Sequence, residues 1–308
     1  MVIGHLGAPG PKLRERKDLR ADQGPNDEQL LQRFTDASDE AAFAELVRRH
    51  GPMVLAVCQR ILNNEQDAAD AFQGTFLVLV RKAASLSQPE MLGPWLYGVA
   101  YRTALKARAR ESRRRAHERQ VANMHAVGPI SAGDGQQFRV ELDEELNLLP
   151  EKYRAPLVLC YLEGKTHEEA ARLLGCPPGS MSWRLARAQE ALRERLVRRS
   201  PAGMPCTAVP VVLFPASAPA AVPVELVNST AHAARLFASG AGGISDSVAG
   251  LAEEVLSSMA RRRSSWKQAL WLAAILALFA TAGWAVAGLV LGPAQGNKPA
   301  GGGCGGHR

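Results

Sequence analysis

The chain contains serine and arginine side chains at a spacing that suits contact with a nucleic acid. They lie in the stretch KTHEEAARLLGCPPGSMSWRLARAQ, residues 165–189. Arginine can pair bidentately with guanine in the major groove, and serine can bond to bases or phosphates. A helix that displayed these side chains on one face could therefore read DNA. The side chains expected on that face are Ser180, Ser182, Trp183, Arg184 and Arg187. For Trp183, the alternative is that its bulky ring packs inward.

A helix-turn-helix is the element that would position this face. Thr166 followed by Glu169 has the spacing of a capping box, which begins a helix. Gly175 can adopt the left-handed conformation that ends it. The next helix would bury Met181 and Leu185 and place its N-terminal part in the major groove. The alternative is an ordinary helical hairpin whose arginines face water.

A second basic stretch, YRTALKARARESRRRAHER, covers residues 101–119. A cationic helix beside aromatic rings suits contact with phosphates and stacking on unpaired bases. The alternative is a solubilising helix end whose cations complement the helix dipole. Trp95 and Tyr97, which precede the stretch, are either core or DNA-facing. The candidate DNA-binding residues of this second stretch are Tyr101, Arg102, Lys106 and Arg108.

Helical periodicity runs through almost the whole chain, and no alternating strand pattern survives for more than a few residues. We therefore expect an all-α fold with two small domains, a four-helix domain at residues 26–120 and a helix-turn-helix domain at residues 138–199. Other parts are expected to be a disordered lead at residues 1–25, a linker at 121–137, a proline- and alanine-rich spacer with amphipathic helices at 200–265, a transmembrane helix at 266–291 and a glycine-rich tail at 292–308.

Composition narrows the class of protein. The 308 residues include 37 Lys and Arg and 30 Asp and Glu, a net charge of +7 that favours an anionic partner. The five cysteines lie far apart and lack metal-ligand spacing, so we expect no metal site, no disulfide framework and no cofactor. The sequence also lacks a phosphate-cradling glycine loop, paired catalytic carboxylates and a nucleophile with a histidine. An enzyme is not expected, and no catalytic residue is assigned.

The run Ala269–Leu291 contains no charged residue. As a helix it would reach about 35 Å, enough for a hydrocarbon core of about 30 Å. We therefore predict a single inner-membrane span at residues 266–291, with a buried soluble helix as the alternative. Four basic residues lie just before the run, so the positive-inside rule places the N-terminal domains in the cytoplasm and the C-terminus outside it.

Several stretches carry a resemblance to a known family: DEQLLQRF, AAFAELVRRHGPMVLAVCQRIL, DAADAFQGTFLVLVRKA, LGPWLYGVAYRTAL and LPEKYRAPLVLCYLEGKTHEEAARLLGCPPGSMSWRLARAQEALRERL. Together they resemble, in order, the two domains of an extracytoplasmic-function (ECF) sigma factor of bacterial RNA polymerase. The resemblance covers residues 26–198. One departure is that Arg102 and Lys106 stand where many members of the family carry Asn and Asp.

The resemblance implies a promoter-specificity subunit, with catalysis left to the polymerase. The first domain would bind the polymerase clamp and open the upstream edge of the minus-ten element, and the second would read the minus-thirty-five element as duplex. On this resemblance, Ser180, Ser182, Arg184 and Arg187 would face the minus-thirty-five DNA. The residues expected to face the clamp are Asp67, Asp70 and Gln73.

The expected partners are therefore core RNA polymerase, promoter DNA and the membrane. We expect helices at residues 224–238 and 245–259 to restrain the sigma domains until cleavage or a membrane partner releases them. An anti-sigma factor or a membrane protease is the kind of partner expected for such control. The alternative function is a membrane-anchored one-component helix-turn-helix regulator that occupies an operator without engaging polymerase.

Overall fold

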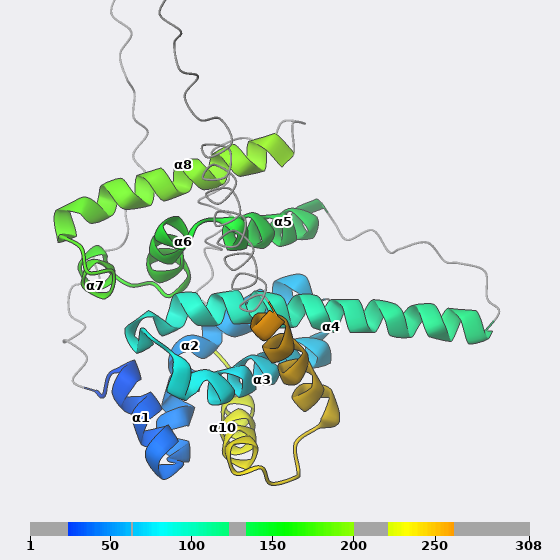
Figure 1. Ribbon diagram of the computed structural model, residues 1–308. Coiled ribbons are helices and arrows are strands. Elements are labelled where there is room, and N and C mark those ends of the chain that lie inside the picture. The colour runs from blue at the N-terminus through cyan, green and yellow to red at the C-terminus, as the bar shows by residue number, and fades with distance from the viewer. Residues whose placement is uncertain (1–23, 63, 123–133, 200–220, 262–308) are drawn as a thin grey trace, which may run out of the picture. The chain divides into compact units, whose positions relative to one another are not determined.

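The computed structural model describes residues 24–62, 64–122, 134–199 and 221–261 of the chain (Figure 1). The regular elements within these ranges are all helical, so the all-α prediction is confirmed for the described part. The chain divides into a large unit, residues 1–255, and a second unit, residues 256–308.

The predicted membrane span at residues 266–291 lies outside the described residues, as do the glycine-rich tail and nearly all of the N-terminal lead. Within the described part, no helix has both the length and the apolar character needed to cross a membrane.

The N-terminal helices share one core, as predicted. An aromatic cluster joins Phe34, Phe43, Phe72 and Phe76, with successive ring centroids 4.4 to 6.2 Å apart. All four rings are buried, so they contribute a large part of the apolar area that holds the helices together. The helices are α1 (Asp27–Ala37), α2 (Glu40–Ile61), α3 (Glu65–Lys82) and α4 (Leu92–Ala122).

The helix-turn-helix part is built around the last long helix, α8. Its buried residues form one stripe at spacings of three and four, against which α5, α6 and α7 pack. These buried residues are Met181, Leu185, Ala188, Leu192 and Leu196. The elements are α5 (Asp134–Leu148), α6 (Glu151–Leu157), the π-helix η3 (Val158–Leu162), α7 (His167–Leu173), the 3-10 turn η4 (Pro178–Ser180) and α8 (Met181–Arg199).

A buried polar cluster joins α5 to α2 and α4. The Arg60 guanidinium makes two hydrogen bonds, of 2.7 and 2.9 Å, to the carboxylate of Asp143. The Tyr97 hydroxyl donates to the same carboxylate over 3.0 Å. Although burial disfavours the charged form of Arg60, the neighbouring carboxylate raises its pKa. Tyr97 is fully buried, which settles that its ring is core rather than DNA-facing in this structure.

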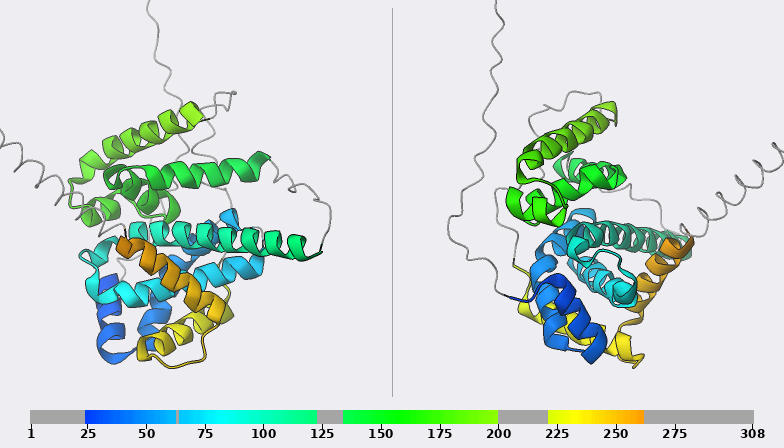
Figure 2. Two further views of the ribbon diagram at one scale, coloured as in Figure 1. Left: turned by 45° about the vertical axis from the view of Figure 1, so that its right-hand side comes forward. Right: turned by 60° about the vertical axis from the view of Figure 1, so that its left-hand side comes forward.

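The sequence downstream of α8 is folded where the structure describes it. The helix α10 (Val224–Ser239) packs against α2 and α3, and a further helix covers residues 246–261 (Figure 2). Both helices were predicted, at residues 224–238 and 245–259. Within the predicted spacer at residues 200–265, these helices lie on α2, α3 and α4, and their buried side chains extend the core of the first helical part.

Candidate nucleic-acid interface

The predicted helix-turn-helix is present, and local interactions set its turn. The Thr166 hydroxyl oxygen accepts from the backbone N–H of Glu169 over 3.2 Å, and the Glu169 carboxylate accepts from the Thr166 N–H over 2.8 Å. This is the capping box expected from the sequence. Gly175 has a φ of +60°, the left-handed conformation that ends α7 at little cost for glycine.

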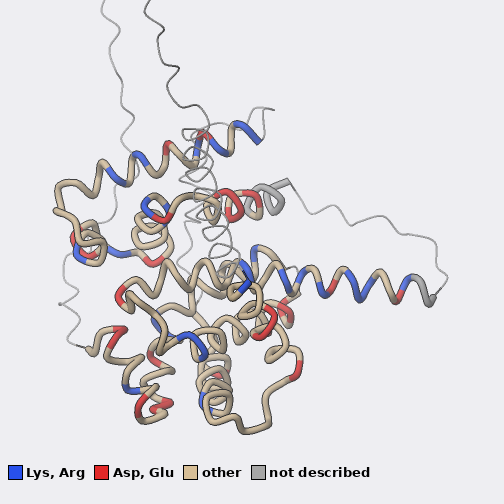
Figure 3. Tube along the Cα trace, in the orientation of Figure 1, with Lys and Arg blue, Asp and Glu red and all other residues tan. Residues whose placement is uncertain are grey.

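The two faces of α8 differ as the sequence predicts. Met181 and Leu185 are buried, whereas Trp183 is 67% exposed. Ser182 and Arg187 are exposed, and Ser180 and Arg184 are half-buried. The candidate residues therefore lie together at the N-terminal end of the helix that follows the turn, where a recognition helix contacts base edges. Figure 3 shows further basic residues along α8.

The candidate residues on α4 do not form a single exposed group. Arg108 is exposed, but Tyr101 is only 5% exposed, so its ring is not available for base stacking in this structure. Arg102 and Lys106 are half-buried, and the Lys106 amino group lies 3.2 Å from the Glu254 carboxylate. The exposed basic residues of this helix lie farther along it, at Arg113, Arg114, Arg115 and Arg119 (Figure 3).

The three residues expected to face polymerase lie on one stretch of α3 and are all half-buried. The Asp70 carboxylate accepts a hydrogen bond from the Ser247 hydroxyl, and the Gln73 amide donates to the Ser229 oxygen over 3.1 Å. Burial, together with the charge of Glu111, raises the pKa of Asp67. In this structure, residues from the C-terminal segment therefore lie on the predicted polymerase-binding surface.

Glu254 is a contact residue that the sequence analysis missed. Its carboxylate binds Lys106 and also accepts from the Arg110 guanidinium over 2.8 Å. Burial would raise the pKa of Glu254, but the hydrogen bonds from these two cations lower it. No local signal marks this glutamate, because its partners lie more than a hundred residues away along the chain.

A buried histidine joins the first two helices to the start of the helix-turn-helix. The His50 ring nitrogens lie 2.7 Å from Glu163 and 2.9 Å from Asp27. Burial opposes the charged ring, yet the charge of Glu163 and the hydrogen bonds to both carboxylates raise the pKa of His50 to about 9. Arg49 pairs with Asp27 over 2.6 Å. Gly93 makes room for this arrangement, since a Cβ there would overlap the Glu163 carboxylate.

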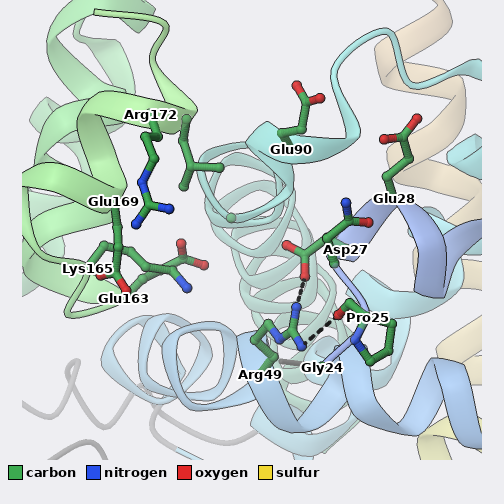
Figure 4. Close-up of a pocket in the computed structure, with 13 residues that line it drawn as sticks. Gly24, Pro25, Asp27, Glu28, Arg49, Glu90, Glu163, Lys165, Glu169 and Arg172 are labelled. Atoms are coloured by element: carbon green, nitrogen blue, oxygen red, sulfur yellow. Dashed lines mark hydrogen bonds and ion pairs between the residues drawn. The ribbon is translucent and has the colours of Figure 1, made fainter. Parts of the chain in front are cut away.

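A cavity of about 360 Å³ opens beside this histidine cluster (Figure 4). Five carboxylates and three cations line it, so it offers a ligand charges of both signs. The charged residues labelled in the figure are Asp27, Glu28, Arg49, Glu90, Glu163, Lys165, Glu169 and Arg172. Within the part of the chain that the structure describes, no group of three or more His, Cys, Asp or Glu residues could hold a metal ion.

Comparison with known proteins places both helical parts in one family. Residues 46–114 match the family described as Sigma-70 region 2, and residues 139–192 match Sigma-70, region 4. The first match covers most of α2 together with α3 and much of α4. The second begins within α5 and extends into α8, so it includes the helix-turn-helix.

Several curated proteins are also similar to the chain over most of their own length. It is 30% identical to the ECF RNA polymerase sigma factor SigE of Mycolicibacterium smegmatis over 188 residues, 57% of this chain and 71% of that protein. It is 31% identical to the RNA polymerase sigma factor CarQ of Myxococcus xanthus, over 54% of this chain and 95% of that one. The RNA polymerase sigma-H factor of Pseudomonas aeruginosa is 28% identical, over 55% and 93% of the two chains.

These likenesses agree with the exposed face of α8 and with the order of the two helical parts. The chain belongs to the ECF family of RNA polymerase sigma factors.

Proposed function

We propose that the chain binds core RNA polymerase and directs promoter-specific initiation. In this proposal the N-terminal end of α8 reads the minus-thirty-five element. Ser182, Trp183 and Arg187 are its exposed candidate contacts, with Ser180 and Arg184 beside them. The observation that carries the proposal is that a region 2 match and a region 4 match occur in this order, and that the second includes the exposed N-terminal end of α8.

The first helical part would bind the polymerase and the minus-ten element. Asp67, Asp70 and Gln73 are the proposed polymerase contacts on α3. Arg102, Lys106 and Arg108 are proposed to contact promoter DNA from α4. Tyr101 is buried in the structure. It is proposed as a DNA contact only in a conformation that uncovers its ring.

Co-purification with core polymerase tests this proposal. The full chain in detergent, and residues 1–199 in buffer, should each be mixed with purified core enzyme and separated by size. We expect the core enzyme to retain the chain. We also expect the mixture to make transcripts from promoter DNA that the core enzyme alone does not make. A one-component regulator would instead bind duplex DNA without the polymerase, so DNA binding with no retention would favour that alternative.

The proposal includes attachment to the inner membrane through residues 266–291, with the sigma domains in the cytoplasm. The uncharged run Ala269–Leu291 and the basic residues before it support this part. Carbonate extraction of cell membranes should leave the full chain in the pellet and release a chain ending at residue 261. Extraction of both forms would exclude a spanning segment. An anti-sigma factor or a membrane protease remains the proposed kind of regulatory partner.

A further inference from the structure

The C-terminal segment, defined here as residues 222–255, lies on the residues that would bind polymerase. Ser229 on α10 binds Gln73, and Ser247 binds Asp70. Glu254 binds two cations of α4, Lys106 and Arg110. The segment therefore contacts α3 on its predicted polymerase-binding face, and it pairs with a candidate DNA-binding lysine.

Apolar side chains fix the segment to this surface. Four apolar residues of α10 at helical spacing are buried, and so are four apolar residues in the helix that follows. They are Val227, Ala231, Ala234 and Phe237 in α10, followed by Val248, Leu251, Ala252 and Val255. Burial of these side chains makes the segment a docked element rather than a passive linker.

Glycines in the sigma helices allow the segment to approach closely. A Cβ on Gly74 would lie 3.6 Å from the Cβ of Leu251, and a Cβ on Gly51 would lie 2.9 Å from a methyl group of Val222. The second distance is shorter than normal contact, so a side chain at Gly51 would push the start of the segment away. The surface of α2 and α3 is thus shaped to receive this segment.

The ion pairs at the edge of the segment are partly exposed, so water or another partner can replace them. Arg235 pairs with Glu40, and both side chains are more than a third exposed. Glu254 is 30% exposed where it meets its two cations. Exposed ion pairs contribute little net stability, so release of the segment is opposed mainly by its apolar face. A partner with a larger matching surface could displace it.

We infer that residues 222–255 are a built-in ligand of the surface that binds core polymerase, so that the segment and the polymerase exclude each other. This inference rests on the proposed function. It assigns to the chain itself the control that an anti-sigma protein would otherwise supply. Release of the segment exposes Asp70 and Gln73 and frees Lys106 at the same time.

A reversible disulfide between the segment and α3 tests the inference directly. The Gly74→Cys, Leu251→Cys double variant has a Cβ separation within the range that disulfides require. It should be made in the full chain, with Ser at Cys176, Cys206 and Cys304, and purified in detergent. The oxidised form should lose binding to core polymerase in the absence of DNA, and reduction should restore it. The controls carry either Gly74→Cys or Leu251→Cys alone. Oxidation should not change their binding to core polymerase.

A charge reversal tests the same inference without a change in α3. Glu254→Lys places a third cation beside Lys106 and Arg110 and should loosen the segment. The affinity for core polymerase should rise by about 5-fold to 100-fold, a typical range for coupled equilibria. Glu253→Lys is the matched control, because Glu253 is exposed and the change in net charge is identical. Its affinity should stay within about twofold of the unmodified chain.

The possible outcomes separate the inference from the function on which it rests. If the oxidised double variant binds core polymerase as tightly as its reduced form, the segment does not compete, although the proposed function stands. Equal affinities for Glu254→Lys and Glu253→Lys would contradict the inference in the same way. If neither the unmodified chain, the reduced variant nor Glu254→Lys binds core polymerase, the proposed function fails and the inference with it.

Discussion

Met181 and Trp183 stand two positions apart at the start of α8 and have opposite environments. Met181 is fully buried, whereas the Trp183 side chain is 67% exposed. An exposed indole contributes little to the folded state, and its place at the start of the recognition helix makes Trp183 a candidate DNA contact. The sequence alone left Trp183 open between core and DNA contact, and the structure places it on the surface.

Alanine substitutions at these two positions should separate stability from DNA binding. Met181→Ala should lower the free energy of unfolding by about 2–5 kcal/mol, because it leaves a cavity in the core. Trp183→Ala should change it by less than about 0.5 kcal/mol but weaken binding to promoter duplex by about 1–2 kcal/mol, through loss of apolar contact. Urea unfolding and fluorescence anisotropy measure the two quantities. Unchanged DNA affinity for Trp183→Ala would remove this residue from the interface.

Two arginines of α8 offer a matched comparison at the level of single contacts. Arg187 lies near the turn, and Arg198 lies near the end of the helix and pairs with Glu194 over 3.3 Å. Arg187→Ala should weaken binding to the preferred duplex by about 1–3 kcal/mol, the usual cost of losing a base contact. Arg198→Ala removes the same charge and should weaken binding by much less. Equal losses would mean that α8 contributes only general electrostatic attraction.

At the scale of elements, the His50 cluster should make stability depend on pH. His50 on α2 meets Asp27 of α1 and Glu163, which follows η3, and Arg49 lies beside Asp27. The pKa of His50 is raised from 6.5 to about 9, so the folded chain keeps a proton that the unfolded chain loses above pH 6.5. Its contribution is therefore complete below pH 6.5 and is lost as pH rises to 9.

Urea unfolding across this pH range measures the effect. The free energy of unfolding should fall by an amount on the order of 3 kcal/mol between pH 6.5 and 9, since each pKa unit corresponds to about 1.4 kcal/mol. His50→Gln should abolish most of this dependence. A wild-type profile that is flat, or that rises with pH, would contradict the charged state of His50.

The cluster of Arg60, Tyr97 and Asp143 joins α2, α4 and α5. Removal of the Asp143 carboxylate should lower the free energy of unfolding substantially. Asp143→Ala would leave the Arg60 side chain, which is only 20% exposed, without its anion, and this should cost on the order of 3 kcal/mol. Glu194→Ala, which breaks the exposed pair with Arg198, should cost less than about 1 kcal/mol. Thermal or urea unfolding compares them. Similar costs for the two variants would mean that the Arg60 site is open to water.

What could be predicted from the sequence differs between local and distant interactions. The capping box of Thr166 and Glu169 and the turn at Gly175 join residues close in the chain, so their spacing alone reveals them. The buried stripe of α8 follows from helical periodicity in the same way. These features fix the helix-turn-helix and its exposed candidate residues, which is why this part of the site could be predicted.

The other contacts join residues far apart and leave no local pattern. Arg60 and Asp143 are 83 positions apart, and His50 and Glu163 are 113 apart. The position of the C-terminal segment is a further example, because its amphipathic helices were predicted but the surface that receives them was not. Helical periodicity shows which face of a helix is apolar, and only the folded chain shows what covers that face.

At the scale of the whole molecule, the proposed function places two DNA-contacting parts and a polymerase-binding surface on one chain. The net charge of +7 favours binding to an anionic partner but gives no sequence preference. Preference must come from the exposed end of α8 and from the first helical part acting on separate promoter elements. The central claim of the proposed function is therefore that the polymerase-bound chain recognises two promoter elements at a fixed spacing.

Transcription from a library of randomised promoters, with the 5′ ends of the transcripts sequenced, tests this property most directly. Purified core polymerase should be combined with the unmodified chain and, in parallel, with Glu254→Lys to favour an accessible surface. We predict start sites that depend on the chain and lie downstream of two enriched sequence blocks at constant spacing. Trp183→Ala should alter only the upstream block. Start sites no different from those of core polymerase alone, or a single enriched block without initiation, would contradict the account.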